Sequence, residues 1–215
     1  MTSALVLVAA SGLAREVLAV LRQGSAYDCI GFLDDSQALP GATVDGLPVL
    51  GTIEEAWRWP DAHLLVCAGR GVVRRAIISR LAAAGVGPQR YATVVHPRVE
   101  VPDGCRIGRG SILLAGVVLT AAVDVGEHVV VMPNVTLTHD CVLEDDATVC
   151  AGVALGGGVV VGSGAYLGMG STVRENRRVG SRATLGMGSV LLTDLPDDQV
   201  WAGVPARPLT ARAPQ

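Results

Sequence analysis

The residues best suited to chemistry in this sequence are the adjacent pair His139 and Asp140. An imidazole can accept a proton from an attacking amine or hydroxyl near neutral pH. A carboxylate beside it would orient the ring and stabilise its protonated form. Successive side chains of a strand point to opposite faces, so the two can act together only if they lie at a bend. Otherwise His139 is a surface or subunit-packing side chain, and Asp140 is a solvated turn residue.

Glycine-rich turns and strand ends form a second group of candidates. The triple glycine at 156–158 leaves the backbone bare, so a ligand can approach it closely, although it could also form only a corner. Ser11-Gly12 precedes a helical pattern, where free N–H groups could meet a phosphate. Asp34-Asp35 ends an apolar run and either contacts a ligand or closes an ordinary turn. The loop at 9–14 lacks the G-x-G-x-x-G pattern, which argues against NAD binding.

Two halves with different periodicity must position these candidates. In the first 92 residues, apolar runs alternate with amphipathic stretches. We predict strands at 4–9, 29–33 and 63–68, and helices that follow Ser11 and cover 70–84. The residues of the second helix that recur at three- and four-residue spacing are Val72, Val73, Ala76, Ile77, Arg80 and Leu81. Strands that alternate with helices predict a parallel sheet with crossover connections, a small Rossmann-like βαβ domain.

From residue 95 the period changes to six. Every sixth residue from Val95 to Leu191 is Val, Ile or Leu, and a small or β-branched residue often stands two positions earlier. A period of six fits neither an α-helix, at about 3.6, nor a coiled coil, at about 3.5, and is the signature of a hexapeptide β-helix. We expect each aliphatic, Val101 included, to point into a prism, and three hexads to form one coil.

Composition excludes several classes of protein. Only 17% of the 215 residues are charged and the net charge is −3, which argues against a disordered chain and against nucleic acid as the main partner. The uncharged stretch 147–173 keeps the six-residue period, so a membrane helix is the weaker interpretation. Five cysteines without a CxxC pair suit a reducing cytoplasm. The N-terminal run is typical of a first strand rather than of a signal peptide.

The order of the motifs resembles a known family. Hexads that run through Thr-Asp-Leu-Pro at 193–196 into Gly-Val-Pro-Ala at 203–206 look like the left-handed β-helix acyltransferases. Four further motifs are similar to the NeuD/PglD-type sugar acetyltransferases: Ala-Ser-Gly at 10–12, Phe-Leu-Asp-Asp at 32–35, Ala-Gly-Arg at 68–70 and Thr-His-Asp-Cys at 138–141. That family comprises sialic acid O-acetyltransferases and N-acetyltransferases of UDP-4-amino-4,6-dideoxy sugars. The resemblance covers nearly the whole chain.

The resemblance implies an α/β plus all-β protein in three parts. Residues 1–92 would form the Rossmann-like sugar-nucleotide-binding domain, residues 93–192 the left-handed parallel β-helix that carries acetyl transfer, and residues 193–215 a C-terminal cap and tail. Family members are homotrimers that use acetyl-CoA, with active sites between neighbouring prisms. We therefore expect a cytoplasmic homotrimer that takes acetyl-CoA and a nucleotide-linked amino sugar, without a metal and without insertion into a membrane.

The family pattern also implies roles for single residues. His139 would be the general base and Asp140 its orienting partner, while the Gly157 N–H would donate to the acetyl carbonyl. Gly168 and Gly186 would line the track of the pantetheine arm. Late arginines could meet the phosphates of CoA, or simply form a solvated face; they are Arg174, Arg177, Arg178, Arg182 and Arg207.

The acceptor side is less defined. The nucleotide would be held by Ser11, Gly12, Asp34 and Asp35. We expect acetyl transfer to the amino group of a nucleotide-linked 4-amino-4,6-dideoxy sugar, with O-acetylation of a sialic acid hydroxyl as the alternative. The sequence departs from the family at positions 9 and 10, where Ala replaces a usual Gly, at Leu13 and Thr148, where many members carry His, and at Ser36, where a basic residue can sit; these leave the acceptor open.

Two other functions share this type of fold. A zinc hydrolyase like the γ-carbonic anhydrases needs three histidines, but His128 and His139 are eleven residues apart in different hexad positions, and His128 is expected on the surface of a strand. A non-catalytic scaffold would fail to bind acetyl-CoA. Cys141 falls in the column of small residues with Cys105, so we interpret it as packing and expect no acyl-enzyme.

Overall fold

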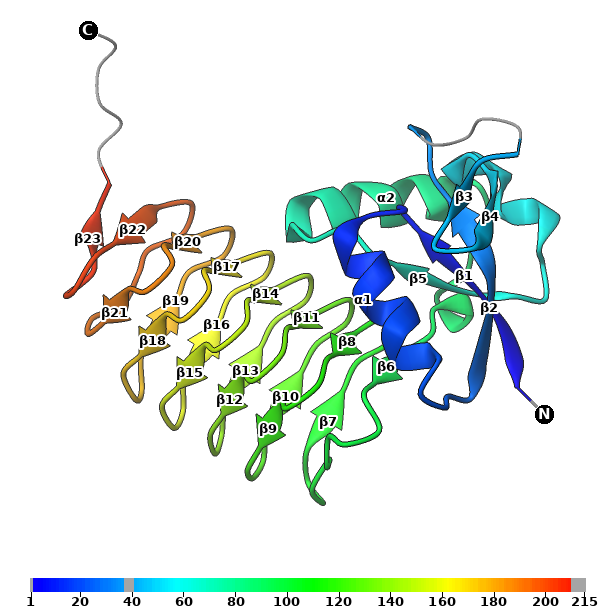
Figure 1. Ribbon diagram of the computed structural model, residues 1–215. Coiled ribbons are helices and arrows are strands. Elements are labelled where there is room, and N and C mark those ends of the chain that lie inside the picture. Colours follow the sequence, from blue (N-terminus) through cyan, green and yellow to red (C-terminus); the bar gives the residue numbers. More distant parts are fainter. Residues whose placement is uncertain (1, 37–40, 210–215) are drawn as a thin grey trace, which may run out of the picture.

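The computed structural model describes residues 2–36 and 41–209, in which a small α/β part precedes a long β-helix (Figure 1). The elements of the first part are β1 (Ser3–Val8), α1 (Gly12–Leu21), β2 (Tyr27–Leu33), β3 (Thr43–Val44), β4 (Leu47–Gly51), the 3-10 helix η1 (Ile53–Arg58), β5 (His63–Val66), α2 (Gly71–Ala83) and the 3-10 helix η2 (Pro88–Arg90). The sheet order is β3-β4-β2-β1-β5, parallel except for β3. The predicted Rossmann-like arrangement is confirmed; β3, β4 and η1 were not predicted.

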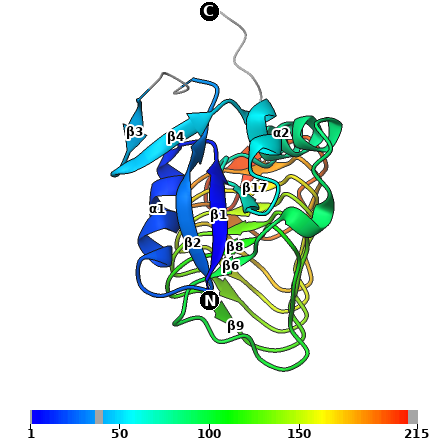
Figure 2. The same cartoon turned by 90° about the vertical axis from the view of Figure 1, so that its right-hand side faces the viewer.

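The two long helices cover opposite faces of this sheet (Figure 2). Leu5 and Leu7 of β1 belong to the hydrophobic cluster that contains α1, whereas Val6 and Val8 belong to the cluster that contains Leu81 of α2. A strand that is buried on both faces reads as a continuous apolar run, which is why β1 is clear in the sequence. Within the described residues, no helix combines the length and the apolar character that a bilayer crossing requires.

The second part is a left-handed parallel β-helix of two-residue strands. They are β6 (Val94–Val95), β7 (Arg106–Ile107), β8 (Ile112–Leu113), β9 (Val118–Leu119), β10 (Asp124–Val125), β11 (Val130–Val131), β12 (Thr136–Leu137), β13 (Val142–Leu143), β14 (Thr148–Val149), β15 (Ala154–Leu155), β16 (Val160–Val161), β17 (Tyr166–Leu167), β18 (Thr172–Val173), β19 (Arg178–Val179), β20 (Thr184–Leu185) and β21 (Val190–Leu191). Residues eighteen apart pair in parallel, as Val131 does with Val149, so three hexads form one coil as predicted. The uncharged stretch 147–173 forms strands of these coils.

The coils build three sheets, one on each side of the prism. The first sheet contains β7, β10, β13, β16 and β19, the second contains β6, β8, β11, β14, β17 and β20, and the third contains β9, β12, β15, β18 and β21. Beyond the last hexad, β22 (Val200–Ala202) and β23 (Arg207–Pro208) extend the second sheet. The predicted limits of the three parts stay predictions, and residues 210–215 of the expected tail lie outside the described residues.

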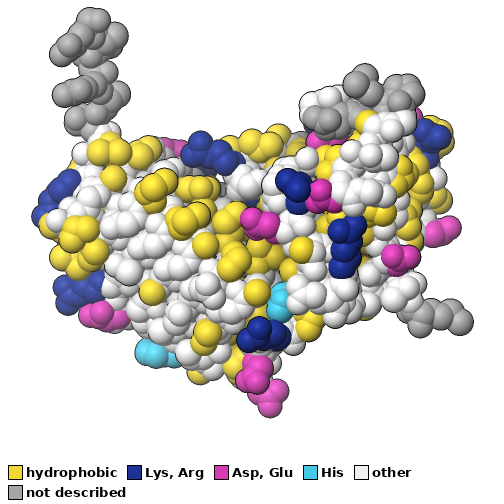
Figure 3. Space-filling view, viewed as in Figure 1, with side chains coloured by type: hydrophobic (Ala, Val, Ile, Leu, Met, Phe, Trp, Pro, Cys, Tyr) yellow, Lys and Arg dark blue, Asp and Glu magenta, His cyan; other side chains and the backbone are white. Residues whose placement is uncertain are grey.

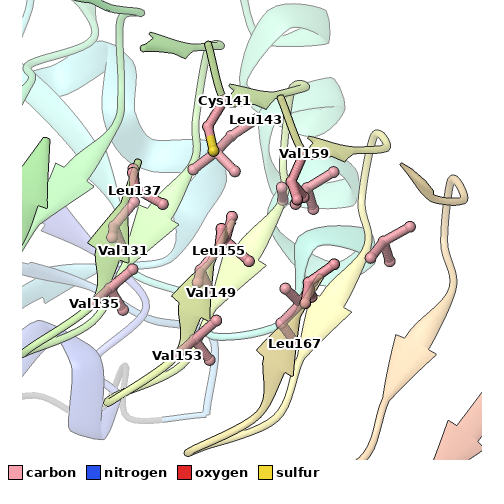
Figure 4. Close-up of a cluster of buried hydrophobic side chains, with 14 of the residues drawn as sticks. Val131, Val135, Leu137, Cys141, Leu143, Val149, Val153, Leu155, Val159 and Leu167 are labelled. Atoms are coloured by element: carbon pink, nitrogen blue, oxygen red, sulfur yellow. The ribbon is translucent and has the colours of Figure 1, made fainter. Parts of the chain in front are cut away.

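The hexad aliphatics fill the prism (Figure 4). Leu137, Val149 and Leu155 are almost fully buried, as are the residues two positions earlier, such as Val135 and Val153. Each such side chain contributes about 1.5–3 kcal/mol through removal of apolar surface from water. The glycine that often follows the aliphatic has a separate cause, because a Cβ on Gly162 would lie 2.5 Å from the backbone nitrogen of Ser181 in the next coil.

The hexad at Val101 is an exception to the prediction. Val101 is 42% exposed and forms no strand. In a regular coil the residue after the aliphatic donates its N–H to the next coil, as Thr120 does to Leu137 at 3.1 Å. The residue after Val101 is Pro102, which has no N–H to donate. The third sheet therefore begins one coil later, at β9.

The prediction that His128 is a surface residue of a strand is wrong. His128 lies in the turn after β10, with a φ of 54°, and only 7% of it is exposed. Its ring packs edge-on against Tyr91, with centroids 4.6 Å apart, and burial lowers its pKa. This side chain fills the joint between the α/β part and the β-helix.

Arg74 of α2 is the central residue of that joint, and it is fully buried. Its guanidinium donates to Ala68 O at 2.7 Å in its own part and, across the joint, to His128 O at 2.7 Å, Asp146 O at 2.8 Å and Ala147 O at 3.0 Å. The helix itself is confirmed, and Ile77 and Leu81 of its predicted apolar spacing are buried, whereas Val72 and Val73 are 52% and 47% exposed. The helix thus turns a charged residue inward, because only a side chain with several donors satisfies these carbonyls.

The close stacking of the coils makes a first prediction. We expect Gly162→Ala to lower the free energy of unfolding by more than about 2 kcal/mol, because the new Cβ must displace backbone. Gly170→Ala is the control: its φ of 67° is strained for Ala, but nothing lies within 4 Å, so a cost of about 1–2 kcal/mol is expected. Urea unfolding of both variants measures the difference. Equal losses would contradict the stacking explanation.

The buried guanidinium makes a second prediction. Arg74→Lys keeps the charge but cannot reach all of its acceptors, so we expect a loss of about 2–4 kcal/mol in the free energy of unfolding. The neighbouring Arg75→Lys changes a half-exposed arginine that pairs with Asp146, and should cost less than about 1 kcal/mol. Denaturation curves of both variants measure these losses. An Arg74→Lys protein as stable as the wild type would show that the joint does not depend on the hydrogen bonds of Arg74.

Candidate active site

His139 and Asp140 form one corner of a coil, in the turn between β12 and β13. The same corner recurs in neighbouring coils, as Ala121–Ala122, Gly157–Gly158 and Glu175–Asn176. The second residue of each turn has a left-handed φ, 61° at Asp140 and 55° at Asn176. His139 and Asp140 thus lie at a bend, which is the arrangement that the two side chains need in order to act together.

The bend brings the two side chains together. Nδ1 of His139 lies 2.8 Å from Oδ2 of Asp140, and each side chain is about two-thirds exposed, at 67% and 66%. When Nδ1 carries the hydrogen and donates it to the carboxylate, the lone pair of Nε2 is left as the proton acceptor. The pair therefore has the arrangement of a general base with an orienting carboxylate.

Gly157 lies beside the imidazole, one coil further along. A Cβ on Gly157 would overlap Cε1 and Nε2 of His139, so only a glycine lets the ring take this position. The Gly158 N–H donates to His139 O at 2.9 Å and fixes the two corners in register. Across residues 2–36 and 41–209, the Gly157 N–H has no hydrogen-bond acceptor. A free donor thus lies next to a free proton acceptor.

Gly168 and Gly186 occupy a different corner, after β17 and β20 of the second sheet, and one chain does not bring them to His139. Close stacking explains both: a Cβ on Gly168 would lie 2.5 Å from Met187 N, and one on Gly186 would lie 2.7 Å from Ala202 Cβ. The residues after them, Met169 and Met187, are largely exposed.

The nucleotide candidates meet at the carboxyl edge of the N-terminal sheet. Ser11 caps α1 by accepting from Ala14 N, and its hydroxyl donates to Cys67 O at 2.5 Å. Gly12 is the first residue of α1. Asp34 Oδ2 accepts from Ala10 N at 2.7 Å, which joins the ends of β1 and β2.

Asp35 has partners of its own. Its Oδ1 accepts from Ile53 N at 3.1 Å, and its Oδ2 lies 2.8 Å from Nη2 of Arg80. The structure therefore groups Ser11, Gly12 and Asp34, with Asp35 beside them. The carboxylates of Asp34 and Asp35 also connect the loop after β2 to the loop after β1 and to the start of η1.

The positions that depart from the family pattern have structural roles. Ala9 has a φ of 73°, the left-handed conformation that glycine adopts without strain. Leu13 is buried against the sheet, and Ser36 donates to Asp34 Oδ1 at 2.6 Å. Thr148 is fully buried, and its hydroxyl donates to Gly69 O at 2.9 Å. Thr148 thus belongs to the joint around Arg74, a role that the hexad pattern does not reveal.

The remaining candidates are engaged in packing or ion pairs. Cys141 lies in the prism core as predicted, and burial raises the pKa of its thiol. Most of the late arginines lie beside acids: Arg174 with Glu175, Arg177 with Asp194, Arg178 with Glu144 and Arg182 with Asp198. Among the described residues, no group of three or more His, Cys, Asp and Glu side chains is placed to hold a metal ion.

Comparisons with known proteins agree with this architecture. Residues 4–81 match the family described as the PglD N-terminal domain. The acetyltransferase domain of PglB from Neisseria gonorrhoeae is 30% identical, with a TM-score of 0.87, over 97% of this chain and 100% of that chain. A search of curated proteins finds no match.

Two further solved structures are similar along their whole length. A variant of perosamine N-acetyltransferase from Caulobacter crescentus, in complex with CoA and GDP-perosamine, is 26% identical with a TM-score of 0.88, over 98% of this chain and 99% of that chain. WeeI from Acinetobacter baumannii is 27% identical with a TM-score of 0.84, over 97% and 100%. With full coverage of the PglB domain at 30% identity, and with the family's N-terminal domain in place, this chain belongs to the PglD/NeuD-type sugar acetyltransferases.

Proposed function

We propose that this chain transfers the acetyl group of acetyl-CoA to the amino group of a nucleotide-linked 4-amino-4,6-dideoxy sugar. The observation that carries the proposal is the contact between the His139–Asp140 pair and Gly157 at one corner. Two of the similar structures support the substrates: the PglB domain has been solved with acetyl-CoA, and perosamine N-acetyltransferase with CoA and GDP-perosamine. The nucleotide and the sugar of this chain are part of the proposal.

The reaction follows from the corner geometry. Nε2 of His139 takes a proton from the sugar amine as its nitrogen attacks the thioester carbonyl. The free N–H of Gly157 donates to the oxygen that becomes negative in the tetrahedral intermediate. Collapse of that intermediate breaks the C–S bond, and the imidazolium returns its proton to the CoA thiolate. Asp140 holds the ring and stabilises the imidazolium between these steps.

The acceptor and the donor approach from different parts of the chain. We assign the nucleotide to the carboxyl edge of the N-terminal sheet, at Ser11, Gly12, Asp34 and Asp35, where Ser11 and Gly12 open helix α1. We assign the pantetheine arm to the corner of Gly168 and Gly186. A metal is not part of the proposed reaction, because a histidine base and a backbone donor supply its chemistry.

Homotrimerisation is part of the proposal, because one chain leaves the site incomplete. His139 is largely exposed, and the pantetheine corner lies elsewhere on the same prism. A second copy could bring its own corner to His139 and exclude water. The outward residues of the third sheet suit such packing, because they are small and uncharged: Val118, Thr136, Ala154, Thr172 and Val190. Much of the β-helix surface seen in Figure 3 is uncharged as well.

We also propose a cytoplasmic location. The five cysteines are free thiols, and four of them are buried. Free thiols persist in a reducing compartment.

The substrate and the base can be tested together. We expect thiol release from acetyl-CoA with one of the UDP-, GDP- or dTDP-linked 4-amino sugars, and a fall in kcat of at least ~10²-fold in His139→Asn. The melting temperature should stay unchanged, because the coil depends on the backbone of His139 and not on its exposed ring. Asp61→Asn is the control and should leave kcat unchanged, because Asp61 is exposed and precedes β5, at the end of the strand opposite to the nucleotide candidates.

Two outcomes would count against this scheme. An unchanged kcat in His139→Asn would remove His139 from the mechanism. Release with sialic acid and with none of the amino sugars would replace the amine by a hydroxyl acceptor, while the base and the donor stay the same.

The role of Gly157 has its own test. Gly157→Ala should leave stability within about 1 kcal/mol, because its φ is not left-handed and the new methyl meets only an exposed ring. It should lower kcat at least ~10-fold by displacing that ring. Combined with His139→Ala, the same change should have little further effect, since no imidazole is left to displace. A loss of equal size in both backgrounds would contradict the proposed contact.

A further inference from the structure

A pocket lies where helix α2 begins beside the second sheet of the β-helix. It is lined by Arg70, Gly71, Val72, Gly164, Tyr166, Arg182 and Thr184. Neither the aromatic ring nor the two guanidinium groups around it have a role in the chemistry described above. The pocket combines residues from both parts of the chain, so it exists only when they are docked.

The two arginines of the pocket differ in their partners. Arg182 forms two hydrogen bonds to the carboxylate of Asp198, both 2.6 Å long, which neutralise it. The guanidinium carbon of Arg70 lies over the ring of Tyr166, 5.4 Å from its centroid. Within the described part of the chain, the Arg70 guanidinium has no ion pair and no hydrogen bond, so the pocket contains one uncompensated cation on an aromatic support.

Tyr166 is itself held in place. It pairs with Thr148 and Thr184 along the second sheet. A hydrogen bond with the Cys150 thiol and partial burial raise the pKa of its hydroxyl. The ring is therefore a fixed support that limits the conformations of Arg70, and an anion bound there pays less of the entropy of ordering a long side chain.

The place of Arg70 along the sheet indicates which anion it meets. The ends of β2, β1 and β5 lie side by side, about 4.8 Å apart, and carry in turn Asp34-Asp35, Ser11-Gly12 and Gly69-Arg70. The hydroxyl of Ser11 joins the ends of β1 and β5 through Cys67 O. Arg70 is thus the last of three strand ends before the β-helix.

We propose that Arg70 binds the diphosphate of the nucleotide-linked acceptor, with Tyr166 as its support. The proposal rests on the proposed function, since the nucleoside must lie at the β2 end for the diphosphate to reach Arg70. A guanidinium donates two parallel hydrogen bonds to phosphate oxygens, which a neutral amide cannot replace. Arg70 is therefore a specificity residue that distinguishes a nucleotide-linked sugar from a free one.

Binding of UDP, GDP and dTDP, measured by calorimetry with the full chain, tests the inference without catalysis. We expect Arg70→Gln to raise the Kd of the preferred nucleoside diphosphate about 10-fold or more. Arg182→Gln, on the same pocket but already neutralised by Asp198, should leave it unchanged. Tyr166→Phe should also leave it unchanged, whereas Tyr166→Leu should raise it, because only the ring supports Arg70. Equal Kd values in wild type and Arg70→Gln would overturn the inference.

Steady-state kinetics separates this inference from the proposed function. If both hold, Arg70→Gln raises KM for the nucleotide-linked amino sugar about 10-fold and leaves KM for acetyl-CoA unchanged. A rise in KM for acetyl-CoA alone would overturn the inference and assign Arg70 to the phosphates of the donor. Tight binding of a nucleoside diphosphate that is weakened in Arg70→Gln, without thiol release from acetyl-CoA, would support the inference and overturn the proposed reaction.

Discussion

One buried guanidinium holds the two parts of this protein together. Arg74 donates to backbone carbonyls on both sides of the joint and to the Thr148 hydroxyl, and burial lowers its pKa to about 10. A charge without a carboxylate partner is expensive to bury, and full use of its donors offsets that cost. Because the hydrogen-bond acceptors are carbonyls of neighbouring coils, this contact sets where the carboxyl edge of the N-terminal sheet lies along the β-helix.

The β-helix solves a different problem, which is to place single residues on an outer edge with little freedom. Its interior is a repeat of aliphatics, and its corners are turns with a left-handed second residue. One turn carries His139 and Asp140, and the equivalent turn of the next coil carries Gly157. The turn geometry aligns the imidazole, the carboxylate and the backbone of the glycine. The chemistry proposed for this corner therefore depends on backbone geometry more than on a pocket of side chains.

Much of this was predictable because it is periodic. The hexads predicted the coils, and the alternation of strands and helices predicted the first part. The failures have local causes: Pro102 lacks the N–H that its coil needs, and His128 turns inward at a corner. The predicted second helix and its buried Ile77 and Leu81 agree with α2, but Val72 and Val73 are exposed, because the tertiary contacts turn Arg74 inward instead. A partner that lies 54 or more residues away, as for Arg74 with His128 and Asp146, leaves no trace in a local pattern.

The α/β part contacts the β-helix as far along as Tyr166, in the pocket that Arg182 and Thr184 also line, and the end of the prism at β21, β22 and β23 lies beyond it (Figure 1). The length of the prism at this end can therefore vary independently of the α/β part. Each coil adds about 4.8 Å along the axis. A gain of eighteen residues after Leu191 would lengthen the prism at this end, while the joint around Arg74 and the turn of His139 stay in place. Evolution could in this way adjust the reach of such an enzyme along an extended donor without rebuilding its active site.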